Sequence, residues 1–489
     1  MIVRRALLVA SGAGRALPTS MFVVAAVCAG LLAWPIGPFD PVSGATGGRG
    51  AVEAPRAAPM TPVLSLRRLP VFLGGLAAGR RLQDDVDRAF ADAGLDGASA
   101  QACVVVHAAG GRTVYARHPE LSLAPASTIK LLTAATVLGR IGPDARLTTD
   151  VRVATPPVNG VVGGDLWVVG GGDPLLATAD FAARAGLSGR PRPASRLEDL
   201  ADRIVAAGVR QVRGRLLGDE HRYDPLRYVP TWKPEYVEQG QSGPLSALIV
   251  NGGFQRLLPT PVPASAPAAD AAGQLATLLA QRGVHVGGSG EGVAPPGAVT
   301  IASLESLPMG QIVTEMLNDS DNTTAELLTK ELGFRFGGVG STAAGVAVLR
   351  ATVPTLAPGE VDDFVLNDGS GLDRSDRATC RALTALLDMP GVREELGASL
   401  PVAARSGTLA ERFAGTPAAG RLMAKTGSLD GVVSLSGYAM DARNDPLAFT
   451  ILVNDPHDAV AHVLVDRVGV VLVGYPQGPA PAELGPRQP

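Results

Sequence analysis

The 489-residue sequence predicts a mixed α/β (α+β) fold in which one sheet is built from both ends of the chain. Strand-like runs occur early, at 102–119, and again at 420–454, while helical periodicity dominates from about 300 to 390. Between about 146 and 290 the pattern changes to short strand-like runs divided by Gly and Pro turns. These observations predict a sheet that joins both ends of the folded chain, with an α/β region inserted between them.

The composition is that of a globular protein, with 46% hydrophobic and 18% charged residues. The formal net charge of −3 gives no electrostatic support for nucleic-acid binding, so no nucleic-acid partner is expected. Only four of the 43 basic residues are lysines: Lys130, Lys233, Lys330 and Lys425. Each lysine is therefore more informative than a lysine in an average sequence.

Residues 1–35 are expected to form a signal peptide or a membrane anchor. Arg4, Arg5 and Arg15 precede an apolar run of 14 residues at 21–34. This run is shorter than the roughly 20 residues that span a bilayer comfortably, so the sequence leaves cleavage and anchoring open. Either alternative predicts an extracytoplasmic protein whose membrane contact is limited to this segment.

Three cysteines are spread widely along the chain. Cys28 lies in the apolar N-terminal run, Cys103 in a strand-like run and Cys380 at an expected helix start. Export would permit a disulfide between the last two, but two distant cysteines are weak evidence for one, and buried free thiols are the favoured expectation. Neither their spacing nor nearby histidines indicate a metal site, and no metal or cofactor is expected.

The segment "PASTIK" places Ser127 three residues before Lys130 at the start of an apolar helix, expected at about 127–139. Residues at i and i+3 share a helix face, and Pro125 favours a helix start. A serine hydroxyl is a poor nucleophile unless a base removes its proton, and a buried lysine can lose its own proton to become that base. Taken alone, the pattern S-x-x-K is more often a capping serine followed by an exposed lysine.

Two further motifs change this balance. Ser320-Asp321-Asn322 comes just before an expected helix, and Lys425-Thr426-Gly427 lies at an expected strand end. S-x-x-K, S-x-N and K-T-G in this order form the active-site set of penicillin-binding proteins and serine β-lactamases. Each motif alone is weak, but all three in order, in the expected helix, loop and strand contexts, indicate an acyl-enzyme mechanism.

The chemistry of such a mechanism suggests a role for each group. Ser127 would attack a peptide carbonyl, and its N–H together with that of Ser428 would bind the oxyanion. Ser320 would relay a proton to the leaving amine, and Lys425 would tune Ser320 electrostatically.

The remaining motif residues would bind substrate. Asn322 would hold Lys130 and a substrate amide, and Thr426 would bind the terminal carboxylate with help from the charge of Lys425. Gly427 would let the substrate backbone lie along the strand edge.

From about residue 80 to 475 the chain resembles the D-alanyl-D-alanine carboxypeptidase/endopeptidases among the class C low-molecular-mass penicillin-binding proteins. Ser127 and Ser320 are 193 residues apart, and that family carries large inserted domains at this place. The resemblance implies a penicillin-recognising serine transpeptidase/β-lactamase-like fold, peptidoglycan stem peptides as substrate and β-lactams as covalent inhibitors. Further matching segments are "GGGDPLL" (170–176), "GDEHRYD" (218–224), "SALIVNGG" (246–253) and "DGSGLDR" (368–374).

The resemblance also implies a domain layout. Residues 76–145 and 291–476 would form a discontinuous transpeptidase-like catalytic domain, and 146–290 the inserted domain or domains. A Pro/Gly/Ala-rich linker at 36–75 would precede them, and 477–489 would be a flexible tail.

Three further residues are implied by the resemblance to line a pocket for the side chain of the stem peptide: Asp219, Leu372 and Arg374. A carboxylate and a guanidinium would suit a zwitterionic side-chain end such as that of diaminopimelate. The alternative for Asp219 is a turn residue after a strand, and for 368–372 a glycine-rich loop that fixes backbone shape. Asp430 departs from the pattern, because a small polar residue is expected there, and this affects the expected substrate preference.

Three other functions fit the sequence less well than this one. A Ser-His-Asp hydrolase is disfavoured, because none of the six histidines lies in the motif set and no G-x-S-x-G occurs. A class A-type β-lactamase lacks support, because no convincing E-x-x-x-N segment is present and the insertion is large. A non-catalytic cell-wall-binding scaffold would not need Ser127 and Lys130. Carboxypeptidase and endopeptidase activity use the same residues and are not separated by the sequence.

Overall fold

The computed structural model describes residues 69–97, 100–185, 191–256, 260–356, 363–455 and 457–477. The expected signal or anchor, the expected linker up to residue 68 and the expected tail from 478 lie outside these ranges. The first helix, α1 (Leu69–Asp92), begins earlier than expected, so residues 69–75 belong to a helix and not to a linker. Pro70 adds to the linker-like composition of this segment, but it lies in the first turn of the helix. A proline is tolerated there, because the N–H that it lacks would have no intrahelical partner.

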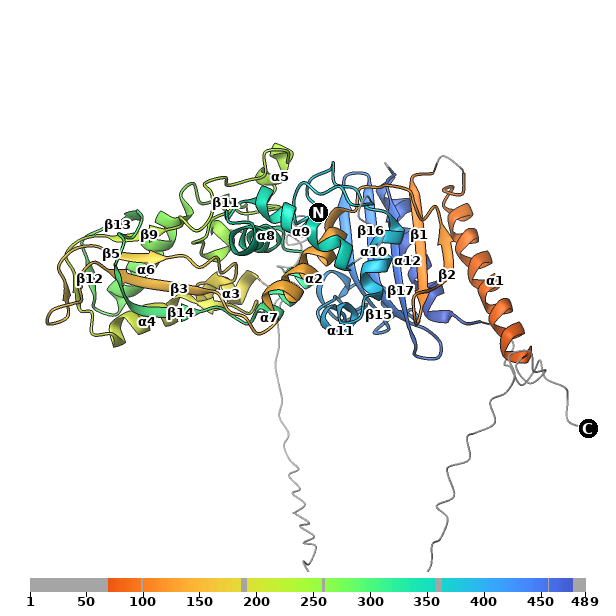
Figure 1. The fold of residues 1–489 in the computed structure, drawn as a ribbon, viewed down its shortest axis with the longest axis horizontal. Helices are drawn as coiled ribbons and strands as arrows, with labels where there is room; N and C mark the ends of the chain where they lie inside the picture. The colour runs from red at the N-terminus through yellow and green to blue at the C-terminus, as the bar shows by residue number, and fades with distance from the viewer. Residues whose placement is uncertain are drawn as a thin grey trace, which may run out of the picture. The chain divides into compact units, whose positions relative to one another are not determined.

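A five-stranded antiparallel sheet joins the two ends of the folded chain, as the sequence predicts (Figure 1). Its order is β15-β16-β17-β1-β2, and β1 pairs with β17 from Ala102 opposite Val453 to His107 opposite Ala448. The third motif lies on β15, which is an edge strand. The strands are β1 (Ala102–Ala108), β2 (Arg112–Arg117), β15 (Leu422–Leu429), β16 (Val432–Met440) and β17 (Pro446–Val453).

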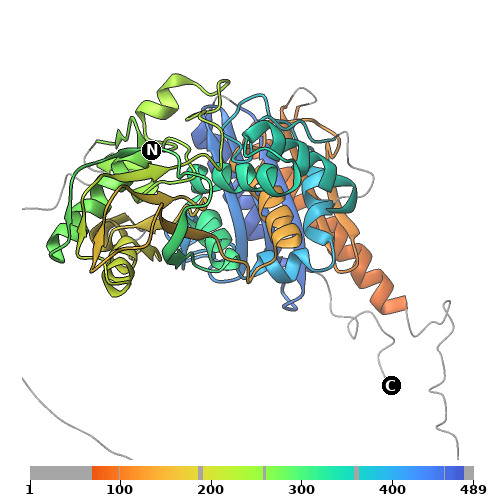
Figure 2. The same ribbon diagram turned by 60° about the vertical axis from the view of Figure 1, so that its left-hand side comes forward.

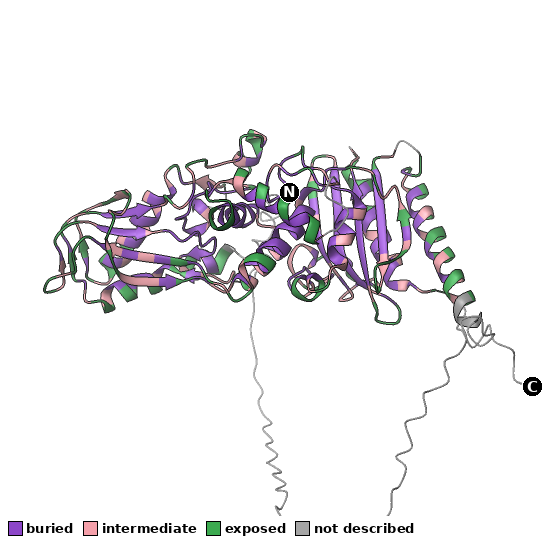
Figure 3. Cartoon of the chain, viewed as in Figure 1, coloured by how far each residue is buried: buried purple, intermediate pink, exposed green. Residues whose placement is uncertain are grey.

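Both faces of this sheet are covered, which explains why its strands read as nearly continuous apolar runs (Figure 3). Successive side chains of a strand point to opposite faces. Cys103 and Val105 of β1 accordingly join the core beneath the catalytic helices, whereas Val104 and Val106 join the core under α1 and α12 (Asp458–Gly474).

The helices that carry the first two motifs pack in the first of these cores. Helix α2 (Lys130–Ile141) is buried from Lys130 to Leu138. The other helices of this part of the chain are α7 (Met309–Asp319), α8 (Asn322–Phe336), α9 (Thr342–Leu356), α10 (Cys380–Asp388) and α11 (Val392–Gly397), with short 3₁₀ turns η2 (Ala126–Ile129) and η6 (Gly407–Leu409).

The inserted region has its own sheet, of order β13-β9-β5-β3-β14, and its own core. In the turned view of Figure 2 its yellow and green elements stay a separate group from the blue strands. The main strands are β3 (Thr148–Val153), β5 (Leu166–Val169), β9 (Leu216–Asp219), β13 (Ser289–Glu291) and β14 (Val299–Glu305). Since β14 pairs with β3, this sheet continues past the expected boundary at residue 290.

Shorter elements complete the inserted region. Its helices are α3 (Ala179–Ala185), α4 (Leu197–Ala206), α5 (Pro234–Glu238) and α6 (Pro267–Gln281), with the 3₁₀ turn η4 (Asn251–Gly253). Its remaining strands are β4 (Val161–Val162), β6 (Leu176–Ala177), β7 (Ser195–Arg196), β8 (Gln211–Val212), β10 (Phe254–Arg256), β11 (Val262–Pro263) and β12 (His285–Val286).

A disulfide joins Cys103 of β1 to Cys380 of α10, so the expectation of free thiols is wrong. The two residues are separated by 277 positions in sequence, but their Cα atoms are 5.9 Å apart and both are fully buried. Sequence spacing alone did not reveal the pair, because it arises from the packing of α10 on the sheet. Within the described ranges, no helix is long and apolar enough to cross a membrane.

Candidate active site

The first motif lies where a 3₁₀ turn becomes a helix. Ser127 is in η2, and Lys130 begins α2, so the side chains of the two residues meet across one turn. The Lys130 Nζ and Ser127 Oγ atoms are 2.9 Å apart. Ser127 is partly exposed to solvent, whereas Lys130 is completely buried. The nucleophile can thus meet a substrate while its neighbouring amine is shielded from water.

The Lys130 amine has three partners that suit a neutral amine. It donates to Asn322 Oδ1 and to the carbonyl oxygen of Ser370, both at 2.6 Å, and its third partner is the Ser127 hydroxyl. A neutral amine has two hydrogens and one lone pair, so it can donate to the two acceptors and accept from the hydroxyl. Burial lowers the pKa of Lys130 to about 8, although the charges of Asp368 and Glu326 oppose this shift.

The second motif is a tight turn between α7 and α8. Ser320 ends α7 in a left-handed conformation with φ 55° and ψ 35°, and Asn322 is the first residue of α8. Asp321 caps α8 by accepting a 3.0 Å hydrogen bond from the Thr324 N–H. The Asn322 Nδ2 donates to the carbonyl of Gln241, at 2.7 Å, while its Oδ1 accepts from Lys130. The side-chain amide of Asn322 is therefore oriented from both ends.

The third motif brings a second buried amine to the turn. Lys425 Nζ lies 2.8 Å from Ser320 Oγ and 2.6 Å from the carbonyl oxygen of Thr426. Burial, with a smaller effect from the charge of Lys130, holds the pKa of Lys425 well below its usual range. The structure brings the three motifs together, through the contacts Ser127–Lys130–Asn322 and Ser320–Lys425.

The edge strand β15 packs directly against the turn that carries the nucleophile. A Cβ added at Gly427 would lie 2.9 Å from the Pro125 carbonyl oxygen and 2.1 Å from Ser434 Oγ, so only glycine fits there. Ser434 Oγ also donates to the Pro125 carbonyl, at 2.8 Å. Ser428, one residue further on, is exposed at the sheet edge, and Thr426 contacts Thr408 through their hydroxyls at 2.9 Å.

Two of the three residues implied for the side-chain pocket lie close to this edge. Leu372 is buried against Val229, Trp232 and Tyr236 of the inserted region. Arg374 is exposed and donates to the carbonyl of Asp430, just beyond the third motif. The unexpected Asp430 side chain lies 3.2 Å from Lys233 Nζ, so this charge pairs with the inserted region.

Asp219, the third of these residues, is placed elsewhere. It ends β9 and is 1% exposed, and its carboxylate accepts from the N–H groups of His221 and Ala294 and contacts the His221 ring. Among the described residues, none of its hydrogen bonds reaches a motif residue. This geometry is that of a turn residue, the alternative considered from the sequence, and the substrate-binding role of Asp219 stays a prediction.

Sequence reasoning missed the backbone atoms that orient the catalytic side chains. The carbonyls of Ser370 and Gln241 hold Lys130 and Asn322, but carbonyls leave no mark in a motif. Asp368 shapes the loop that presents Ser370, because its carboxylate accepts from the N–H groups of Ser370, Gly371 and Asp373 and from Trp232 Nε1. The segment "DGSGLDR" is part of the family resemblance, but its sequence does not indicate a contact with Lys130.

Comparisons with known proteins place the chain in a family. The model of the D-Ala-D-Ala carboxypeptidase 3 (S13) family matches residues 82–264 and 255–470. A D-alanyl-D-alanine carboxypeptidase of Actinomadura sp. is 31% identical over 89% of this chain and 93% of its own length. The carboxypeptidase DacB of Mycolicibacterium smegmatis is 31% identical over 74% of this chain and 78% of its own. Penicillin-binding protein 4 of Haemophilus influenzae has a similar fold, with TM-score 0.66, 19% identity and coverage of 78% of this chain and 97% of that chain.

The fold and the serine–lysine pair define the class of serine peptidases on a penicillin-recognising fold. Within that class, the chain belongs to the D-Ala-D-Ala carboxypeptidase 3 (S13) family. It is therefore a serine-type D-Ala-D-Ala carboxypeptidase, and the family, fold and enzyme class expected from the sequence are confirmed.

Proposed function

We propose that this enzyme cleaves the D-Ala-D-Ala end of peptidoglycan stem peptides through an acyl-enzyme on Ser127, with Lys130 as the base. One observation carries the proposal: a fully buried amine lies 2.9 Å from a partly exposed serine hydroxyl and has two acceptor-only partners. This arrangement supports a neutral Lys130 that accepts the Ser127 proton during attack.

Acylation would proceed in two proton-coupled steps. Ser127 Oγ attacks the carbonyl carbon between the two D-alanines while its proton passes to Lys130 Nζ, and the N–H groups of Ser127 and Ser428 bind the oxyanion. The C–N bond then breaks, and the terminal D-alanine leaves as a free amine after it receives a proton through Ser320. Water subsequently hydrolyses the ester on Ser127 by the same groups in reverse.

Substrate binding would use the edge of β15. A stem peptide can add as an extra strand beside Thr426, Gly427 and Ser428, because no other described strand of the sheet lies on that side of β15, and the isolated bridge between Val402 and Met423 lies nearer the start of the strand. The terminal carboxylate would be bound by the Thr426 hydroxyl near the Lys425 amine. Leu372 and Arg374, next to this edge, are candidates to contact the side chain of the stem peptide.

The setting of the reaction is extracytoplasmic, because peptidoglycan lies outside the cytoplasmic membrane. Export through the N-terminal segment, whether as a cleaved signal or as an anchor, agrees with this location. The same catalytic groups would also cut D-centred crosslinks if the cleft accepts a larger leaving group, which makes endopeptidase activity part of the proposal. We also expect penicillins to acylate Ser127, since a β-lactam carbonyl is open to the same attack.

The direct test is labelling with a fluorescent penicillin, together with mass analysis of products from a stem pentapeptide and a crosslinked dimer. The wild type should be labelled and should release D-alanine, whereas Ser127→Ala should do neither. Ser289→Ala, at an exposed serine of the inserted region, is the matched control and should behave as wild type. Equal labelling of wild type and Ser127→Ala would contradict the proposal, and rapid turnover of penicillin would indicate a β-lactamase.

A further inference from the structure

An arginine from the inserted region contacts the second catalytic motif on both sides of Ser320. The Arg192 guanidinium donates to Asp321 Oδ2, and its Nε lies 3.8 Å from Asp319 Oδ2. The Arg192 side chain is only 13% exposed, and the two carboxylates are similarly shielded. One cation therefore spans the residues immediately before and after the catalytic serine of the turn.

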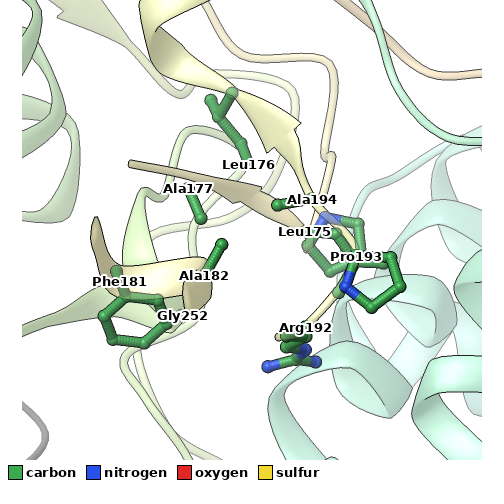
Figure 4. Close-up of a pocket in the computed structure, with 10 residues that line it drawn as sticks. Leu175, Leu176, Ala177, Phe181, Ala182, Arg192, Pro193, Ala194 and Gly252 are labelled. Carbon is green, nitrogen blue, oxygen red and sulfur yellow. The ribbon is translucent and has the colours of Figure 1, made fainter. Parts of the chain in front are cut away.

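The backbone of Arg192 is fixed by its own neighbours. Pro191 and Pro193 flank it, and a residue before proline is restricted to extended conformations. The Arg192 N–H also donates to the Ala182 carbonyl of α3, at 2.8 Å. Figure 4 shows Arg192 beside Leu175 and Pro193, at one end of a small apolar pocket of the inserted region. The backbone that carries the guanidinium is thus restricted by its prolines and hydrogen-bonded to α3.

The turn that it contacts needs such a partner for two reasons. Ser320 has φ 55°, a conformation that residues other than glycine adopt rarely and keep only when their surroundings enforce it. The turn is also rich in acid, because Glu315, Asp319 and Asp321 lie close together. Burial and the charge of Asp321 raise the pKa of Asp319 to about 6, while the charge of Arg192 opposes this rise.

The pKa of Asp321 depends on Arg192 more strongly than the pKa of Asp319 does. Its burial alone would raise its pKa, but the charge of Arg192, with the hydrogen bond from Thr324, lowers it below its ordinary value. Asp321 therefore stays ionised, caps α8 with one oxygen and binds Arg192 with the other. Any movement of Asp321 would shift its two neighbours, Ser320 and Asn322.

We propose that Arg192 is a positioning residue for catalysis, which holds Ser320 against Lys425 and Asn322 against Lys130 from outside the sheet-and-helix body. The inference rests on the proposed function, because it assigns a supporting role to groups named there. The inserted region would then contribute to catalysis as well as to substrate contact. Its arginine neutralises the carboxylates beside Ser320 and fixes the turn that holds Ser320, through which the leaving-group proton would pass.

The test separates acylation from binding. Stopped-flow acylation by penicillin gives a non-covalent dissociation constant and a first-order acylation rate for each variant. Arg192→Gln should lower the acylation rate by about 10²-fold, the typical effect of displacing a catalytic group by about 1 Å, with the dissociation constant within about threefold of wild type. Arg184→Gln, an exposed arginine of the same region that pairs only with Asp180 among the described residues, is the matched control and should retain wild-type rates.

Two further variants guard against a loss of folding. Arg192→Lys keeps the charge but not the forked geometry, and should recover part of the rate. Asp321→Asn keeps an α8 cap, since asparagine caps helices as well as aspartate does, but loses the charge that Arg192 binds. The double variant Arg192→Gln/Asp321→Asn should be no slower than Arg192→Gln alone, because both changes break one contact.

The proposal would be overturned if Arg192→Gln acylates at the wild-type rate or changes only the dissociation constant. It would also be overturned if the rate losses of the two single variants multiply in the double variant. If Arg192→Gln does not fold, a wild-type rate in Asp321→Asn overturns it equally well. These outcomes leave the proposed function untouched, because that depends on loss of acylation in Ser127→Ala.

Discussion

At the scale of single residues, the catalytic base is produced by burial of the Lys130 amine. The Lys130 amine contacts Asn322 Oδ1, the Ser370 carbonyl and the Ser127 hydroxyl, so its neutral form can donate to the first two and accept from the third. Burial disfavours the charged form, and the pKa of about 8 shows that desolvation exceeds the opposing effect of the nearby carboxylates. The protein thereby obtains a base without a histidine.

Penicillin acylation should therefore accelerate with pH. Only neutral Lys130 can accept the Ser127 proton, so below the pKa of about 8 the rate should fall about tenfold for each pH unit and should level off above it. The measurement is the acylation rate constant between pH 6 and 9.5. Lys130→Met should be about 10²–10⁴-fold slower and should lack this rise. A wild-type rate that is constant from pH 6.5 to 9 would contradict a lysine base.

Gly371 shows how tightly the loop beneath Lys130 is fitted. It has φ +76°, and an added Cβ would lie 2.0 Å from the Ala126 carbonyl oxygen. Gly371→Ala should therefore combine backbone strain with a steric clash, lower the free energy of unfolding by about 2–5 kcal/mol and slow acylation. Gly110→Ala is the matched control, because Gly110 also has φ +76° but open space around it. Urea unfolding should show a loss of about 1–2 kcal/mol for the control, from strain alone. Equal losses in both variants would contradict the packing argument.

At the scale of elements, α10 is fastened to the sheet by the disulfide between Cys103 and Cys380 as well as by packing. This bond closes most of the folded chain into one loop, because its two cysteines are separated by 277 positions in sequence. A crosslink over a long loop reduces the entropy of the unfolded chain, so we expect the bond to stabilise the fold by about 2–5 kcal/mol.

The variant Cys103→Ala/Cys380→Ala should accordingly unfold at a lower temperature than the oxidised wild type and remain active at 25 °C. Thermal unfolding followed by circular dichroism gives the Tm of each protein with and without reductant. Reductant present during unfolding should lower the wild-type Tm toward that of the variant and leave the variant unchanged. A wild-type Tm that does not respond to reductant would contradict the role of the bond.

Some of the helices, strands and contacts were predictable from the sequence and others were not. Strand pairing between the two ends of the chain was predictable, because apolar runs such as β16 and β17 must be buried on both faces and need neighbours. The disulfide was not, because it depends on the packing of two elements far apart in sequence. The helical state of residues 69–75 was not either, since a proline such as Pro70 suits a linker as well as a first helical turn. In the site, the three motifs were found by side-chain type, whereas the Ser370 carbonyl and Arg192 act through contacts that no local pattern encodes.

At the scale of the whole molecule, the inserted region is fastened to α8, the helix that begins with Asn322. Glu331 of α8 is fully buried and binds Arg222 at 2.7 and 2.9 Å and the Tyr223 hydroxyl at 2.9 Å. The adjacent Lys330, also buried, binds the Asp224 carboxylate and donates to the Leu226 carbonyl at 2.9 Å. One face of α8 therefore carries the insertion while its first turn carries a catalytic side chain.

Breaking this attachment should destabilise the start of α8 as well as the adjoining part of the insertion. Glu331→Gln removes the charge that Arg222, Tyr223 and, within α8, Arg335 share. Loss of one partner from a buried pair commonly costs about 3–5 kcal/mol. Arg222 is 25% exposed and can recover some hydration, so the lower end of that range is expected. Glu305→Gln is the matched control, because Glu305 is 66% exposed and its ion pair with Arg146 is long, at 3.9 Å. This variant should lower the free energy of unfolding by less than about 1 kcal/mol.

Urea unfolding gives both free energies, and hydrogen exchange shows where the structure loosens. In Glu331→Gln, exchange should accelerate in the segment 221–226 and at the start of α8, while β16 and β17 keep their protection. Acylation should slow in parallel, because Asn322 at the start of α8 holds Lys130. Faster exchange confined to the insertion, with unchanged acylation, would mean that the insertion and the catalytic turn move independently, and would contradict the idea that α8 couples them.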